Sequence, residues 1–385
     1  MKDKLLVCDF IKSHSNWEEI LSKSPYCITV SRDRIFCRNL MLLKYRMGES
    51  DFSDEMVREC RGLILDEDTL EPICVPFFKF GNYGEGYCPS IDWSNCWVSE
   101  KIDGSLLKIV KMGDNLLVST NGMIDAFKCH VTNIFGCSDD SFGKLFVSAI
   151  ESNPLLGTDK SKRMDFLKGL LNENTTYMFE LTSPYNRVVV RWNETHLNFL
   201  GARDNKTLRE IHFTENVLKD YFNVPKVFKI GNIVDCIKAA ERLDENNEGF
   251  VVCDKDFNRI KVKSSLYVRL HQMAGNGSLT AARAIDIVQR GEISEVISYF
   301  PEFRDSILLV KSSYENFCDG LSRKWEELKA LNLSSRKDSA KWILSNFSVP
   351  HFAFAMLDGK TKDPRDWLKA FPSWKIVEMI LKNNG

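Results

Sequence analysis

A change of hydrophobic pattern near residue 265 constrains the fold of this chain more than any other feature. Before it, short apolar runs of strand length alternate with turn signals; after it, apolar residues recur at helical spacing. The length of 385 residues is enough for two domains with a sizeable core. We therefore predict an α+β domain over residues 1–265 and an all-α domain over residues 266–385.

Turn signals divide the first part of the chain into short expected elements. Residues 106–110 and 115–120 are apolar runs joined by Lys-Met-Gly-Asp, a pattern typical of a hairpin. Residues 141–153 instead space their apolar side chains as a helix does. We predict further strands at residues 27–40, 62–80, 95–100, 176–183, 187–192, 196–203, 249–254 and 259–265.

Composition excludes several classes of function. The formal net charge of -1 provides no global basic field, so nucleic acid would have to be held by local basic patches. None of the 12 cysteines forms a C-x-x-C pair and no two histidines have ligand spacing, which argues against a zinc or redox motif. The apolar start of the chain is too short for a signal peptide, and no segment has the length of a membrane span. We expect a soluble, cytoplasmic monomer.

The segment Lys-Ile-Asp-Gly at residues 101–104 is the first candidate for chemistry. It lies between two predicted strands, but a four-residue pattern alone is a weak signal. It becomes significant because other characteristic segments lie before and after it in a set order along the chain. They are the segments that begin at Arg58, Phe77, Phe179, Pro184, Glu248 and Ile260.

Two lysines on the last predicted strand favour an anionic ligand. Lys261 and Lys263 are two residues apart, so both side chains point to the same face of the strand. Two ammonium groups on one face repel each other unless an anion lies between them. A polyphosphate is a natural candidate for that anion.

Together these segments resemble motifs I, III, IV and V of the covalent nucleotidyltransferases, which include ATP-dependent ligases and mRNA-capping enzymes. The similarity is greatest to the bacteriophage RNA ligase 1 family, which repairs cleaved tRNA. The segments that carry it span residues 49–271 and read ESDFSDEMVRECRGLILD, EKIDGSL, FELTSPYNRVVV, EGFVV and KVKSSLYVRLH. The resemblance implies an ATP-grasp-like nucleotidyltransferase domain with antiparallel sheets around a nucleotide cleft.

The resemblance also implies roles for individual residues. Lys101 would attack the ATP α-phosphate and form lysyl-AMP, helped by a pKa that neighbouring cations depress. Lys261 and Lys263 would hold the phosphates, and Glu248 would hold Mg²⁺ (or Mn²⁺) through its water shell. Asp103 and Gly104 would shape the turn that presents the lysine, and Glu180 would accept a hydrogen bond from a ribose hydroxyl. Further nucleotide contacts are implied for Arg61, Lys79 and Tyr267.

The activity implied is the ATP-dependent joining of 5′-phosphate and 3′-hydroxyl RNA ends. AMP moves from the lysine to the RNA 5′-phosphate, and the 3′-hydroxyl then expels it. RNA repair follows as the role, with cleaved tRNA as the candidate substrate. The helical domain is expected to recognise the body of the RNA, an expectation that depends on analogy.

Several of these residues have structural alternatives that the sequence leaves open. Arg61 fits a salt-bridged arginine at a strand end, and Lys79 fits a lysine whose stem covers an apolar patch. Tyr267 fits core packing in a helix, and Glu248 fits a turn. Glu180 lies in an apolar strand, where an unpaired carboxylate would be costly, so a ligand or hydrogen-bonding role is favoured.

One position departs from the family pattern, and other functions remain as competitors. Asn121 lies where the family often carries a basic residue; an amide can donate to phosphate but brings no charge. A DNA ligase or capping guanylyltransferase would share the chemistry, but these usually append a β-barrel where this chain shows helical periodicity. A catalytically inactive RNA-end-binding protein is the third possibility, against which the intact lysines and Glu248 argue.

Overall fold

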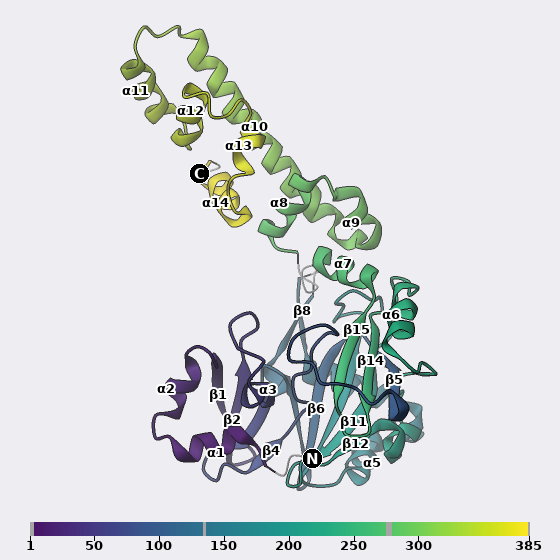
Figure 1. Cartoon of the computed structure of the whole chain (residues 1–385). Helices are drawn as coiled ribbons and strands as arrows, with labels where there is room; N and C mark the ends of the chain where they lie inside the picture. The colour runs from purple at the N-terminus through teal and green to yellow at the C-terminus, as the bar shows by residue number, and fades with distance from the viewer. Residues whose placement is uncertain (1–3, 134–135, 275–278, 384–385) are drawn as a thin grey trace. The chain divides into compact units, whose positions relative to one another are not determined.

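The computed structural model describes residues 4–133, 136–274 and 279–383 and divides the chain into two compact units. The units are Met1–His271 and Gln272–Gly385, so the division falls inside helix α7 (Ser265–Ala274) rather than at residue 265. Tyr267 and Leu270 of α7 are buried. Figure 1 shows antiparallel sheets in the first unit and helices in the second.

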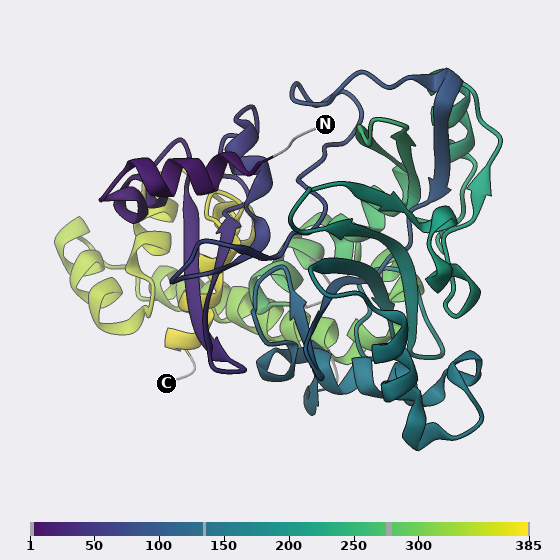
Figure 2. The ribbon, with the colours of Figure 1, turned by 90° about the horizontal axis from the view of Figure 1, so that it is seen from below.

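The first unit contains three larger sheets and a small one, and all their pairings are antiparallel. Figure 2 shows the β1–β2 hairpin on one side of this unit and the β14–β15 pair on the other. In the order of the sheets, the strands are β1 (Ile28–Ile35), β2 (Arg38–Tyr45), β3 (Arg61–Asp66) and β4 (Pro72–Cys74); β12 (Glu210–His212), β11 (His196–Asp204), β10 (Thr175–Thr182), β6 (Ser105–Met112) and β7 (Asn115–Thr120); β13 (Val227–Phe228), β5 (Cys96–Glu100), β14 (Gly249–Asp254) and β15 (Arg259–Lys263); and β8 (His130–Asn133) with β9 (Gly136–Ser141).

Helices cover the sheets of the first unit through apolar faces. The helix predicted over residues 141–153 is confirmed as α4, whose Leu145, Phe146 and Ile150 enter the core of the five-stranded sheet. The Ser141 side chain caps it by accepting the backbone N–H of Lys144. The helices of this unit are α1 (Leu6–Ser13), α2 (Trp17–Ser22), α3 (Glu55–Glu59), α4 (Phe142–Ser152), α5 (Arg163–Leu170), α6 (Ile233–Glu241) and α7.

The predicted strands agree with the structure at every run but one. The hairpin is confirmed as β6 and β7, with Gly113 in the left-handed region of its turn. The strand predicted over residues 187–192 is wrong, because this segment is a loop. The backbone N–H groups of Val189 and Val190 donate to Asp103 Oδ2 (2.9 and 2.7 Å) instead of a neighbouring strand.

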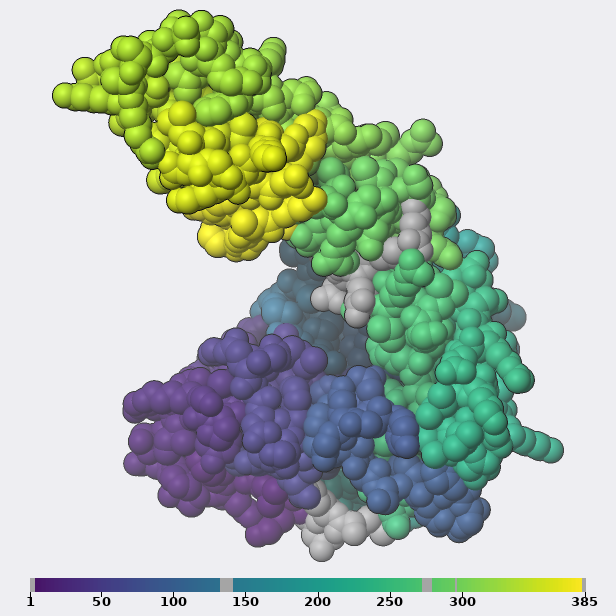
Figure 3. Space-filling view, turned by 45° about the horizontal axis from the view of Figure 1, so that its top comes forward, coloured from purple at the N-terminus to yellow at the C-terminus, as the bar shows by residue number. Residues whose placement is uncertain are grey.

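The described part of the second unit is built from helices alone. They are α8 (Ala281–Arg290), α9 (Ile293–Tyr299), α10 (Arg304–Ala330), α11 (Arg336–Asn346), α12 (Pro350–Leu357), α13 (Pro364–Leu368) and α14 (Ser373–Asn383). Phe317, Leu321 and Leu328 of α10 enter the core of this unit, which agrees with the helical spacing of apolar residues after residue 265. Figure 3 shows α14, in yellow, packed against the helices of the same unit.

Candidate active site

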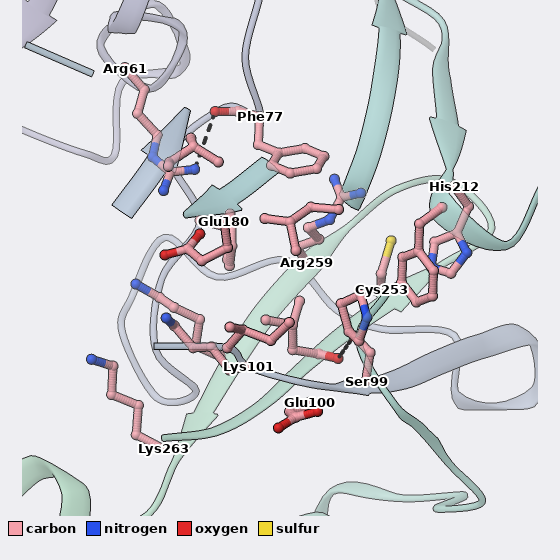
Figure 4. Close-up of a pocket in the computed structure, with 18 residues that line it drawn as sticks. Arg61, Phe77, Ser99, Glu100, Lys101, Glu180, His212, Cys253, Arg259 and Lys263 are labelled. Carbon is pink, nitrogen blue, oxygen red and sulfur yellow. Dashed lines mark hydrogen bonds between the residues drawn. The ribbon is translucent and has the colours of Figure 1, made fainter. Parts of the chain in front are cut away.

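A pocket of about 200 Å³ lies in the first unit and is lined by residues of all three larger sheets. Strand β3 contributes Arg61, β10 contributes Glu180, and β15 contributes Lys261 and Lys263. Lys101 follows β5 and also lines the pocket. Figure 4 shows side chains of both charges converging on this space.

Lys101 is held between its own strand and the neighbouring one. Its backbone N–H donates to the Gly249 carbonyl of β14 at 2.8 Å. Its Nζ lies 2.6 Å from Glu248 Oε2, and Glu248 Oε1 lies 2.9 Å from Lys263 Nζ. Glu248 does not line the pocket but bridges two amines that do, and its side chain is only 4% exposed.

The predicted depression of the Lys101 pKa is wrong. Burial lowers this pKa, but attraction by Glu248, Glu180 and Asp103 outweighs burial and raises it above the ordinary value. Burial likewise raises the pKa of Glu248, yet Lys101 and Lys263 hold it below its ordinary value. The two groups form a charged pair, so Lys101 carries its proton at neutral pH.

Lys261 on β15, unlike Lys101, has a depressed pKa. Burial is the largest cause, and repulsion by Lys79 and Lys101 adds to it, so the pKa falls to about 7. Lys261 is also fixed in place, because its N–H donates to the Gly81 carbonyl and its own carbonyl accepts from Tyr83. A bound polyanion would relieve this repulsion, as the spacing of the lysine pair indicates.

Glu180 lies on β10, where Figure 4 shows its carboxyl on the side of Arg61 and the lysines. Burial raises its pKa to about 8, against the opposing attraction of Lys101. At neutral pH the carboxyl therefore holds its proton, and it is able to donate a hydrogen bond as well as accept one. A ribose hydroxyl could use either mode.

Close packing explains the turn that follows Lys101. A Cβ at Gly104 would lie 2.4 Å from the carbonyl oxygen of Leu181, so no larger residue fits there without a shift. Asp103 is buried and accepts a hydrogen bond from the Tyr267 hydroxyl at 2.7 Å. Tyr267 is itself 1% exposed, and Lys263 Nζ lies 5.1 Å from the centre of its ring. These residues support the pocket from behind rather than line it.

Two cations predicted for the site have different surroundings. Arg61 lines the pocket, and its Nη1 donates to the Phe77 carbonyl at 3.5 Å. Lys79 does not line it; its amine lies 5.0 Å from the centre of the Phe52 ring and 6.0 Å from that of Tyr87. Burial lowers the pKa of Lys79, with Arg61 as the next cause. Asn121 does not line the pocket either.

The residues at the end of the pocket away from the lysines were not predicted from the sequence. His212 of β12 stacks on Trp97 at 4.1 Å between ring centres, and burial followed by Arg259 lowers its pKa to about 4. Cys253 and Arg259 line the same end (Figure 4). Cys253 and Arg259 are opposite each other on β14 and β15, whereas His212 comes from β12 of another sheet, so no spacing along the chain brings His212 to them.

The donors near Lys101 suit a hydrated magnesium ion better than a fully protein-bound one. Among the residues that the structure describes, no three His, Cys, Asp or Glu side chains form a metal-binding group. Glu248 is ionised, buried and adjacent to the phosphate-binding lysines. A single carboxylate of this kind is enough for Mg²⁺, which usually keeps several waters and binds substrate phosphates.

Comparison with known proteins identifies the family. The family model described as RNA ligase, of the T4 RNA ligase 1 type, matches residues 59–267, more than half of the chain. A putative bifunctional polynucleotide kinase/RNA ligase of Autographa californica nuclear polyhedrosis virus is 30% identical over 281 residues, covering 70% of this chain and 38% of that protein. An RNA ligase of Rhodothermus phage RM378 is 21% identical, covering 78% and 79%. An archaeal ATP-dependent RNA ligase structure, form 2, aligns at 14% identity over 81% and 82%, with a TM-score of 0.45.

These matches place the chain, with its pocket and antiparallel sheets, among the ligases. More narrowly, the chain belongs to the RNA ligase family of the T4 RNA ligase 1 type. It corresponds to little more than a third of the length of the baculovirus relative. None of the helices in the described ranges is long and apolar enough to cross a membrane.

Proposed function

We propose that this chain joins 5′-phosphate and 3′-hydroxyl RNA ends with ATP, through lysyl-AMP on Lys101 and an RNA-adenylylate. The observation that carries the proposal is that Lys101, Lys261 and Lys263 share one pocket with Arg61. Four cationic groups around one cavity suit a triphosphate, and one of them is an amine able to attack it.

In the first step the neutral amine of Lys101 attacks the α-phosphorus of ATP. An N–P bond forms, the bond to the β-phosphate oxygen breaks, pyrophosphate leaves, and the amine gives up its proton. Because Lys101 is protonated and paired with Glu248, it must lose its proton before it can attack. Glu248 then needs a positive charge other than that of Lys101 beside it. Lys263 already holds the second carboxylate oxygen at 2.9 Å. Mg²⁺ bound near Glu248 would supply further charge neutralisation for the phosphates.

The end of the pocket away from the lysines is suited to the nucleoside. Phe213 lies beside His212 at this end, and Leu200 also lines the pocket with apolar surface, which a purine base could contact on its faces. Glu180 lies between this end and the lysines and offers its protonated carboxyl to the ribose. The nucleotide would thus be held at both ends, with its α-phosphate close to Lys101.

The later steps use the same cationic groups. AMP passes to the 5′-phosphate of the RNA, and attack by the 3′-hydroxyl releases AMP and forms the phosphodiester. Both are phosphoryl transfers that need in-line geometry and charge neutralisation. We assign the adenylyltransferase function to the first unit and recognition of the RNA to the helical unit. The described part of the second unit consists of helices, which favours an RNA ligase over a DNA ligase or capping enzyme with an appended β-barrel. Repair of cleaved tRNA is supported by the family resemblance.

Labelling with ATP tests the proposal. Incubation with α-³²P-ATP and Mg²⁺ should transfer label to the protein, and Lys101→Ala should abolish it because no amine remains at that position. The surface substitution Lys255→Ala is the matched control and should label as the wild type does. Denaturing gels measure the covalent label.

Further arms of this experiment separate the competing functions. Label from GTP in preference to ATP would point to a capping guanylyltransferase, and joining of DNA in preference to 5′-phosphate RNA would point to a DNA ligase. Absence of label from the wild type, or label that survives Lys101→Ala, would remove the lysyl-AMP proposal. Binding of RNA ends without label would favour an inactive end-binding protein.

A further inference from the structure

Strand β6 carries a lysine that the proposed chemistry does not use. Lys108 is fully buried, with 0% exposure, between four apolar neighbours in the sequence. Its Nζ donates to the Gly62 carbonyl at 2.5 Å, and no acidic side chain of the described residues forms an ion pair with it. Burying an ammonium group without a counterion is costly, so we expect Lys108 to have a specific role at this position.

The partner of Lys108 lies at an irregular point of strand β3. The register between β2 and β3 passes from Leu43 opposite Leu63 to Lys44 opposite Arg61, so Gly62 is the extra residue of a bulge. Pairing of β3 with β4 begins only at Ile64. The Gly62 carbonyl therefore lies outside both regular registers, and the Lys108 amine supplies its donor from another sheet.

The contact is too tight for any residue but glycine. Gly62 has a φ of +79°, in the left-handed region that other residues disfavour. A Cβ there would lie 2.9 Å from Lys108 Nζ and 2.7 Å from the backbone oxygen of Asn121. Lys108 and the Asn121 backbone thus enclose the bulge from the opposing sheet.

The residue before the bulge is Arg61, which lines the pocket. Bulges change the direction in which a neighbouring side chain points. The 3.5 Å hydrogen bond from Arg61 Nη1 to the Phe77 carbonyl is long and weak. The guanidinium also contacts Tyr45 and lies 5.4 Å from the centre of the Phe80 ring, so its direction depends on where the backbone places it among these groups. We propose that Lys108 is a positioning residue, which fixes the Gly62 bulge and thereby aims Arg61 at the phosphates of the bound nucleotide.

The groups around Lys108 support this assignment. Arg61 approaches from β3, Cys74 from β4, and Ser119 lies opposite it on β7. Burial lowers the pKa of Lys108 to about 8, with Arg61 acting in the same direction and Cys74 against it. The amine is thus mainly charged at neutral pH, and a charged donor forms a stronger hydrogen bond to a carbonyl than a neutral one does.

The inference rests on the proposed function, and label transfer from ATP measures it. Lys108→Met keeps most of the length of the unbranched side chain and removes the donor. We expect the KM for ATP in protein labelling to rise about tenfold, because Arg61 is misplaced. The thermal midpoint should be unchanged or higher, since a buried charge is removed. Ser119→Ala alters the same buried layer without touching Gly62 and should leave the KM unchanged.

A double-mutant cycle with Arg61→Lys separates positioning from a general packing role. If Lys108 acts through Arg61, Lys108→Met should raise the KM far less in the Arg61→Lys background than in the wild type. Full additivity, or a KM within twofold of wild type in a stably folded Lys108→Met variant, would overturn the inference.

A second variant covers the case in which Lys108→Met does not fold. Lys108→Gln retains a neutral donor, so it should give a KM between those of the wild type and a variant without a donor. A wild-type KM in Lys108→Gln at pH 7 would contradict the need for a charged donor. Wild-type protein that takes no label would instead refute the proposed function itself.

Discussion

At the scale of single residues, Glu248 governs the charge of the nucleophile. It holds Lys101 and Lys263 on its two oxygens, and its own side chain is almost fully buried. Attraction of this kind raises the pKa of Lys101 even though burial acts against it. The pair with Glu248 therefore keeps the amine of Lys101 in its protonated, unreactive form.

Glu248→Gln should lower the pKa of Lys101, because Glu248 is the largest of the groups that raise it. The change keeps the shape of the side chain and removes only its charge. Acetylation of Lys101 by acetic anhydride across a pH series, measured by mass spectrometry, reports the pKa. Glu245→Gln alters an exposed carboxylate of the same loop and should have no effect. A Lys101 pKa that stays the same or rises in Glu248→Gln would contradict this account.

At the scale of elements, a buried Arg–Glu–Arg group joins two sheets beside the pocket. Glu210 of β12 lies 2.8 Å from Arg203 of β11 and 2.6 Å from Arg259 of β15. Arg259 also stacks over the Phe77 ring at 4.4 Å and lines the pocket. Because β12 and β15 belong to different sheets, this group fixes the wall that the sheets share.

Glu210→Gln should lower the free energy of unfolding by about 3 kcal/mol, since two buried guanidinium groups lose their counterion. Burial raises the pKa of Glu210, but Arg259 and Arg203 hold it below its ordinary value. The stabilisation is therefore complete above the unfolded pKa of about 4.3 and is lost as the pH falls through the lower folded pKa. Urea denaturation at pH 7 and at acidic pH measures both effects. Equal stability of variant and wild type at pH 7 would refute the role.

At the scale of the whole molecule, the two units have separate cores. The residues that line the pocket all belong to the first unit. The core of the helical unit is formed by α8 and α10–α14, with Tyr314, Phe317 and Phe352 among its buried side chains. Nucleotide chemistry and RNA recognition are thus proposed for parts of the chain that are each stabilised by their own apolar residues.

Phe317→Ala should destabilise the helical unit by about 3 kcal/mol or more, through a cavity in its core. Label transfer from ATP should persist at 25 °C, because every lining residue of the pocket lies in the first unit. Phe146→Ala creates a comparable cavity beneath the five-stranded sheet and should impair labelling on warming. The measurement is the amount of label transferred by each variant over a range of temperatures. Equal loss of labelling in the two variants on warming would contradict the separation of the two units.

Local pattern was sufficient for much of the fold. The β6–β7 hairpin, β14 and α4 could be predicted because alternation, turn residues and helical spacing are properties of neighbouring residues. The strand expected at residues 187–192 failed for the opposite reason. Its β-branched run has strand propensity, but Asp103, far away in the sequence, takes the N–H groups of Val189 and Val190.

The sequence by itself determined the two classes of element, the Lys101 turn and the lysine pair of β15, because each depends on residues close together in the chain. Tertiary structure alone decided the charge state of Lys101, the depressed pKa of Lys261, the placement of His212 in the pocket, and the contact of Lys108 with Gly62. All four depend on distances between segments that are far apart in the chain, and electrostatic energy depends on distance and burial rather than on position in the sequence.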